Sequence, residues 1–139
     1  MRKAFKNEQT LAESLAKYGY QVKDTSLVYN SLGYGIPTTP LQNLTFFNAA
    51  SKTTIKQVLE YAVSDGLAKL AQSDKVRAGA TGTIRLPNGE YGVEFCGYFP
   101  ADNPKYSIIV SINKKGLPAS GGLMAGEVFR QIVDYMATE

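Results

Sequence analysis

The feature of this sequence that most constrains its fold is a change of hydrophobic period near Thr81. Residues 81–86, 90–99 and 106–112 alternate in side-chain character with a period of two, which is typical of β-strands. The Asn88-Gly89 pair between the first two runs favours a tight hairpin turn. Three consecutive strands joined by short turns predict an antiparallel meander.

A strongly amphipathic helix is predicted after the meander, and we expect it to pack on one face of the sheet. Its apolar side chains recur three and four positions apart. They are Met124, Val128, Phe129, Ile132, Val133 and Met136.

Two helical patterns open the chain. The first covers residues 7–18 and stops at Gly19. The second begins with a predicted N-cap, a proline at the first helical position and a glutamine that closes a capping box, and it continues to about residue 50. These residues are Thr39, Pro40 and Gln42. Between the two helices we expect an extended segment over residues 20–30 and a loop over residues 31–37.

A third helix is predicted from the capping pair Thr54 and Gln57 to the interruption at Gly66. Its expected buried face comprises Ile55, Val58, Leu59, Ala62 and Val63. The fold class is therefore α/β (α+β), a three-stranded antiparallel meander with a C-terminal helix packed on it and two or three N-terminal helices. We expect a single domain overall, with residues 1–30 as a lead-in and residues 31–139 as the main segment.

Composition narrows the chemistry. The 139 residues are 44% hydrophobic and 19% charged, which fits a globular protein. The net charge of +3 is small and scattered, so nucleic acid is not an expected partner. The sequence has no histidine and a single cysteine, Cys96, so histidine-based catalysis, histidine-based metal sites, an internal disulfide and a cysteine cluster are excluded. We expect no metal and no cofactor. The sequence contains no apolar run of membrane-spanning length and no signal-peptide pattern. Its residues alone do not indicate a cellular compartment.

Residues 78–83 form the candidate binding stretch. Two glycines among small residues allow another molecule to approach the backbone closely. In a strand, Thr81 and Thr83 would place both hydroxyls on one face. Such a strand edge suits an extended peptide or a carboxylate, and the alternative is a tightly packed sheet corner without a ligand.

Four stretches together resemble the class B penicillin-binding proteins. Residues 32–45 contain a Thr-Pro-Leu-Gln helix start, residues 78–83 resemble a Lys-Thr-Gly-Thr strand, and residues 95–106 resemble the strands that follow it. Gly121-Gly122 resembles the start of the family's last helix. The resemblance implies the C-terminal part of a peptidoglycan D,D-transpeptidase domain of the cell division or elongation type, with a partial penicillin-binding-protein/β-lactamase-like fold.

In that family the ligand is a peptidoglycan stem peptide or a β-lactam, bound at the periplasmic face of the inner membrane. Carried over to this sequence, the resemblance makes Thr81, Gly82 and Thr83 the substrate-binding positions. It makes the N–H of Thr83 the second oxyanion donor.

The departures from the family pattern bear on activity. Ala80 stands where the family has the lysine of Lys-Thr-Gly, so that motif position is degenerate. The family's serine nucleophile belongs to a Ser-x-x-Lys motif well upstream of this strand. Ser14 and Ser111 also begin Ser-x-x-Lys matches, but out of the family's order, as chance matches would be. We therefore expect an incomplete, non-catalytic segment that contains no catalytic residues.

Two alternatives stay open. The chain could be a protein-interaction or self-association module derived from that fold, in which the strand edge closes a homodimer. It could also combine with a separate partner that supplies the missing half of the domain and its serine.

Overall fold

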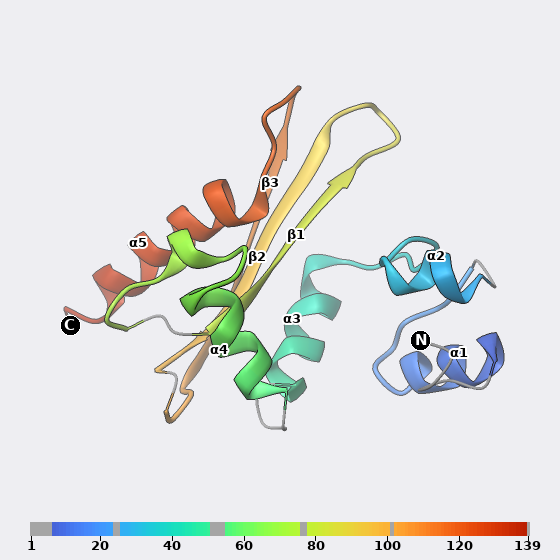
Figure 1. Ribbon diagram of the computed structural model, residues 1–139, viewed down its shortest axis with the longest axis horizontal. Coiled ribbons are helices and arrows are strands. Elements are labelled where there is room, and N and C mark those ends of the chain that lie inside the picture. Colours follow the sequence, from blue (N-terminus) through green and yellow to red (C-terminus); the bar gives the residue numbers. More distant parts are fainter. Residues whose placement is uncertain (1–6, 24–25, 51–54, 76–77, 101, 139) are drawn as a thin grey trace. The chain divides into compact units, whose positions relative to one another are not determined.

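The computed structural model describes residues 7–23, 26–50, 55–75, 78–100 and 102–138, and Figure 1 shows the order of their elements. The chain divides into two compact units, Met1–Phe46 and Phe47–Glu139. The expected partition into residues 1–30 and 31–139 stays a prediction. Helices and strands are α1 (Glu8–Ala16), α2 (Leu27–Ser31), α3 (Pro40–Ala50), α4 (Lys56–Ser64), a 3-10 turn η1 (Lys69–Ala71), β1 (Ala78–Arg85), β2 (Tyr91–Phe99), β3 (Tyr106–Lys114), a π-helical turn η2 (Gly121–Ala125) and α5 (Gly126–Met136).

In the first unit, side-chain caps determine where the helices begin. The Asn7 side chain accepts a hydrogen bond from the Thr10 N–H at 2.9 Å and starts α1. The expected extended segment over residues 20–30 is wrong for its last part, because Leu27–Ser31 is helical. The reason is local, since the Ser26 hydroxyl caps the Tyr29 N–H and one helical turn then buries both Leu27 and Asn30.

The capping box predicted for α3 is confirmed. The Thr39 N–H donates to Gln42 Oε1 at 2.9 Å, and the Gln42 N–H donates to Thr39 Oγ1 at 3.3 Å. Pro40 is the first residue of the helix, where its missing N–H costs nothing. The capping pair expected at Thr54 lies outside the described residues.

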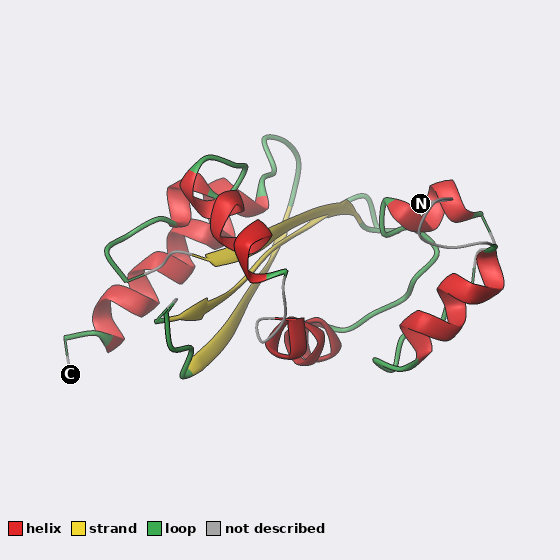
Figure 2. Ribbon diagram, turned by 60° about the horizontal axis from the view of Figure 1, so that its bottom comes forward, coloured by secondary structure: helices red, strands yellow, loops and turns green. Residues whose placement is uncertain are grey.

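The second unit contains the predicted meander. Its strands lie in the order β1-β2-β3, and both pairs are antiparallel (Figure 1). Figure 2 shows the strands of this sheet in yellow. The register places Thr81 opposite Phe95 and Phe95 opposite Val110. β1 begins at Ala78, three residues before the expected start, because Ala78 and Gly79 are already buried against β2.

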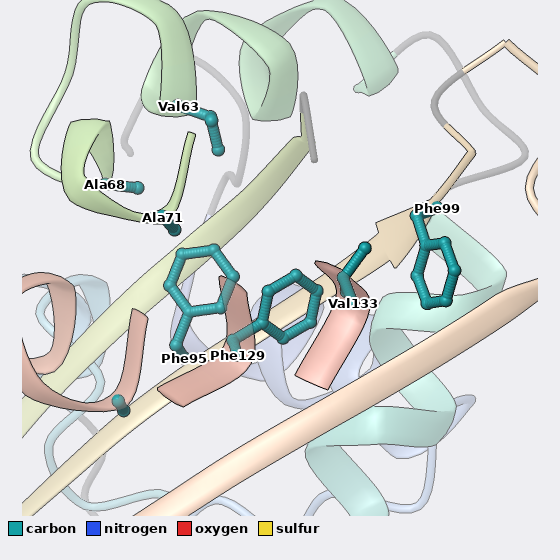
Figure 3. Packing of buried hydrophobic residues seen from close by; sticks show 8 residues of the cluster. Val63, Ala68, Ala71, Phe95, Phe99, Phe129 and Val133 are labelled. Carbon is teal, nitrogen blue, oxygen red and sulfur yellow. The ribbon is translucent and has the colours of Figure 1, made fainter. Parts of the chain in front are cut away.

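The core of this unit lies between one face of the sheet and the elements α4, η1 and α5. The rings of Phe95 and Phe129 pack with centroids 4.7 Å apart at its centre (Figure 3). A Cβ atom on Gly97 would lie only 2.6 Å from Phe129 Cζ, so this glycine allows α5 to approach the strand. The remaining buried members of the cluster are Val63, Ala68, Ala71, Phe99, Ala125 and Val133.

The opposite face of the sheet is covered at the end of β2. The ring of Tyr98 packs against Phe47 of α3 with centroids 5.9 Å apart, and both side chains are buried. A hydrogen bond from Ser107 Oγ of β3 to Asn48 Oδ1 of α3, at 3.3 Å, joins the same surfaces. Tyr98 thus occupies a second packed layer on the sheet.

The expected buried faces of two helices were too wide. In α4, Leu59 and Val63 are buried, whereas Val58 is 65% exposed and Ile55, which precedes the helix, is 44% exposed. In α5, Phe129 and Val133 are buried, and Val128, Ile132 and Met136 are not. Both helices lie on one face of a small sheet, so each buries residues one turn apart and leaves the flanking apolar positions at its border. Among the described residues, no helix has the length and hydropathy needed to cross a membrane.

Candidate functional site

The candidate stretch forms an edge strand of the sheet, and alternate residues along it direct their backbone groups away from β2. The Leu86 N–H donates to the Glu90 carbonyl at 2.8 Å at the hairpin end, so residues 86 and 90 are a hydrogen-bonded pair. Hydrogen-bonded and non-hydrogen-bonded pairs alternate along an antiparallel ladder. Thr83 and Thr81, three and five residues before Leu86 in an unbroken register, therefore direct their N–H and C=O groups away from β2.

The side chains of Thr81 and Thr83 share one face of the sheet, as the alternation predicts, since they lie opposite Phe95 and Val93. Thr83 Oγ1 accepts a hydrogen bond from the Gly121 N–H at 3.0 Å. Within the described part of the chain, the Thr81 hydroxyl makes no hydrogen bond. The O–H of each threonine thus stays free to donate, beside two outward N–H groups.

Ala80 and Gly82 lie on the other face of β1, opposite Cys96 and Glu94. A Cβ atom on Gly82 would meet only the Cβ of Glu94, at 3.8 Å, which is an ordinary contact. The packing therefore does not require a glycine at this position. The part of Gly82 in ligand binding stays a prediction, as do those of Thr81 and Thr83.

Cys96 lies beside Ala80 on this face and is buried. Burial, with a smaller contribution from the Glu94 carboxylate, raises the pKa of its thiol to about 12. Tyr98, two residues along β2, has a buried hydroxyl without a hydrogen-bond partner in the described structure. Burial and the charge of Glu60 raise the pKa of this phenol to about 12 as well. Both groups are neutral at pH 7, and neither is an activated nucleophile.

We expect the Cys96 thiol to resist alkylation in the folded chain at pH 8. Its pKa, raised from 9.0 to about 12, reduces the thiolate fraction, and its burial restricts access. Iodoacetamide labelling followed by mass spectrometry should therefore be at least about tenfold slower in buffer than in about 6 M urea. Because the chain has one cysteine, every label reports this site. Equal rates in the two conditions would contradict the buried position.

The two Ser-x-x-Lys matches have ordinary structural partners. Ser14 Oγ donates to the Thr10 carbonyl at 2.8 Å within α1. Ser111 Oγ donates to Glu94 Oε1 at 3.0 Å, while Lys114 Nζ donates to the carbonyls of Lys115 and Gly116 at 3.3 and 3.4 Å. In neither match is the serine hydroxyl hydrogen-bonded to its lysine within the described residues.

A surface groove among the described residues lies away from the candidate stretch. It has a volume of about 930 Å³, and its lining residues belong to α4, η1, the segment after η1, and Asp102, with none from β1. No group of three or more histidine, cysteine, aspartate or glutamate side chains within the described ranges is arranged to hold a metal ion.

Comparison with known proteins identifies the family. Residues 47–134 match the family model of the penicillin binding protein transpeptidase domain, so the chain belongs to that family. Its structure is similar to the transpeptidase domain of FtsI4 D,D-transpeptidase from Legionella pneumophila, at 30% sequence identity and a TM-score of 0.81. The similarity covers 94% of this chain and 61% of that one, so the fold is that of a partial transpeptidase domain. None of the curated proteins matches the sequence.

The family resemblance and the fold class predicted from the sequence are thereby confirmed. One residue of the site was missed. Gly121 was expected only at the start of the last helix, and its hydrogen bond to Thr83 joins positions 38 residues apart. The Gly121-Gly122 pair was the visible signal, because successive glycines often mark a close approach of two backbones.

Proposed function

We propose that this partial transpeptidase domain binds the carboxylate of a peptidoglycan stem peptide or of a β-lactam at the open edge of β1. The observation that carries the proposal is the arrangement of Thr81 and Thr83, whose side chains share a face and whose N–H groups point away from β2. An extended peptide can add to such an edge through its main chain. The neighbouring hydroxyls can then donate to its carboxylate.

The N–H of Thr83 would serve as an oxyanion donor in the family's reaction. Its outward direction supports this role, because an oxyanion donor must point at the reacting carbonyl of a ligand laid along the strand. Gly82, between the two threonines, leaves the opposite face of the strand unobstructed.

We do not expect residues 1–139 alone to catalyse the family's reaction. Ala80 supplies neither a charge nor a proton donor at the position of the family's lysine. Loss of such a group typically costs about 10² to 10⁴ in rate. Ser14 lies on a helix and bonds its own backbone, and Ser111 bonds a carboxylate on the sheet. Among the described residues, neither serine is hydrogen-bonded to the lysine of its own Ser-x-x-Lys match, which supports the expectation of a non-catalytic segment.

The test is a pair of measurements on the purified chain. An NMR titration with an acetylated D,D-dipeptide should shift the amides of β1, and the corresponding carboxamide should bind more weakly. Incubation with a fluorescent penicillin should leave the chain without a covalent label, both for the wild type and for Ala80→Lys. The single substitution restores a charge but supplies no nucleophile. Time-dependent labelling of Ser14 or Ser111 would overturn the non-catalytic interpretation, and a titration without β1 shifts would overturn the binding site.

A self-association module is the second candidate. The favouring observation is that β1 and β3 are both edge strands of the three-stranded sheet, so either could pair with a strand from another chain. Light scattering distinguishes the candidates, because a module would form a stable dimer that blocks the dipeptide titration. A second chain that carries the serine would instead confer penicillin labelling when the two are co-expressed.

A further inference from the structure

We propose that the Gly121-Gly122 turn is a positioning element for the carboxylate site, which fixes the orientation of both threonine side chains of β1. This inference rests on the proposed function, because it assigns a role to residues that support the same edge. The turn lies at the start of η2, and Gly121 and Gly122 are both buried.

The turn is held in place by steric fit. A Cβ atom on Gly121 would collide with the Glu94 carbonyl oxygen and would lie 2.5 Å from the carbonyl oxygen of Gly82. A Cβ atom on Gly122 would collide with the carbonyl oxygen of Leu67. The turn is thus seated on the backbone of β1 and β2 on one side and on the segment after α4 on the other. Only glycine allows this approach at either position.

Thr83 is oriented by a hydrogen bond from the turn. Its Oγ1 accepts the Gly121 N–H at 3.0 Å, and a β-branched side chain has few rotamers to choose from. The hydrogen bond therefore holds the hydroxyl in one place and occupies one of its acceptor positions. Among the described residues the Thr83 hydroxyl donates its own proton to no group, so that proton is available to a ligand.

Thr81 is oriented by packing against the same turn. Its methyl carbon Cγ2 lies 3.4 Å from the position that a Cβ atom on Gly122 would take, so the methyl group faces the turn. The hydroxyl is the other branch of the same carbon and consequently points elsewhere. Both threonine hydroxyls thereby keep an O–H that can donate to a carboxylate oxygen.

The experiment removes the Gly121 N–H without adding an atom. An amide-to-ester substitution, made by incorporating glycolic acid at position 121, replaces this N–H by an oxygen. The matched control is the same substitution at Gly116, an exposed glycine of the loop after β3 whose surroundings are open within 4 Å. Dissociation constants for the acetylated D,D-dipeptide and its carboxamide are measured by NMR titration. Side-chain variants Thr83→Val and Thr83→Ser are titrated in parallel.

We expect the ester at position 121 to weaken carboxylate binding about tenfold, which is the usual worth of one hydrogen bond, and to leave carboxamide binding nearly unchanged. Thr83→Val should weaken carboxylate binding by at least as much and shift the Gly121 amide resonance. Thr83→Ser should restore both the carboxylate affinity and the wild-type position of the Gly121 amide resonance. The control ester should match the wild type.

The outcomes distinguish the positioning role from the binding site. If the wild type binds the dipeptide and the ester at position 121 binds it equally well, the positioning role is wrong and the binding site stands. If the wild type shows no binding, the proposed function fails, and the positioning role fails with it. If the ester protein does not fold, two other measurements decide the question. They are the shift of the Gly121 amide resonance in Thr83→Val and the difference in carboxylate affinity between Thr83→Val and Thr83→Ser. Equal affinity in these two variants overturns the inference.

Discussion

Replacing Phe95 with alanine is expected to lower the free energy of unfolding by about 3–5 kcal/mol, the usual range for a fully buried phenylalanine. Phe95 is completely buried and packs against Phe129 with ring centroids 4.7 Å apart. It also fills the space that Gly79 leaves, because a Cβ atom on Gly79 would collide with the Phe95 ring. The substitution would therefore open a cavity between β1, β2 and α5 that backbone movement can close only in part.

The measurement is urea unfolding of the whole chain followed by circular dichroism. Tyr135→Ala is the matched control, since it removes an aromatic ring from α5 that is 70% exposed. We expect this control to change the free energy of unfolding by about 0.5 kcal/mol or less. Equal effects of the two substitutions would contradict the central position of Phe95 in the core.

Replacing Gly121 with alanine is expected to destabilise the chain by about 3 kcal/mol, at the upper end of the range for overpacking. The new methyl group would meet the carbonyl oxygens of Glu94 and Gly82, which belong to paired strands and cannot turn aside as a side chain can. Relief requires η2 to lift from the sheet. That movement would break the hydrogen bond from the Gly121 N–H to Thr83.

Gly92→Ala is the control for this prediction. It also adds one methyl group to a strand glycine, but its nearest neighbours are side-chain atoms of Leu86 and Ile84 at 3.6 and 3.7 Å. We expect this variant to stay within about 1 kcal/mol of the wild type in the same urea experiment. If Gly121→Ala is as stable as Gly92→Ala, the turn is not seated on the backbone of the strands.

The strand that carries the candidate site could be predicted from the sequence because its signals are local. The small residues of 78–83, the Asn-Gly turn and the alternation that follows are all read within a few positions of one another. The short helix Leu27–Ser31 was missed for the opposite reason. Five residues are too few to show a helical period, and a single serine cap decided the outcome.

Other errors were tertiary in origin. The positions of Ile55 and Val58 fit a helical period, but the width of the buried stripe depends on how a helix lies on its sheet. That placement is set by partners distant in sequence. Gly97 shows the same dependence, because a Cβ atom there would lie 2.6 Å from Phe129 Cζ and this one glycine determines how closely α5 approaches.

By itself, then, the sequence determined the meander, the amphipathic closing helix, the capping box of α3 and the membership of a transpeptidase family. Each of these depends on residues close together in the chain or on a characteristic order of motifs. Only the tertiary structure decided that the Gly121 N–H meets the hydroxyl of Thr83, 38 residues away. The physical reason is that a hydrogen bond between distant segments leaves no period or spacing in the sequence, so it exists only once the sheet and α5 have packed together.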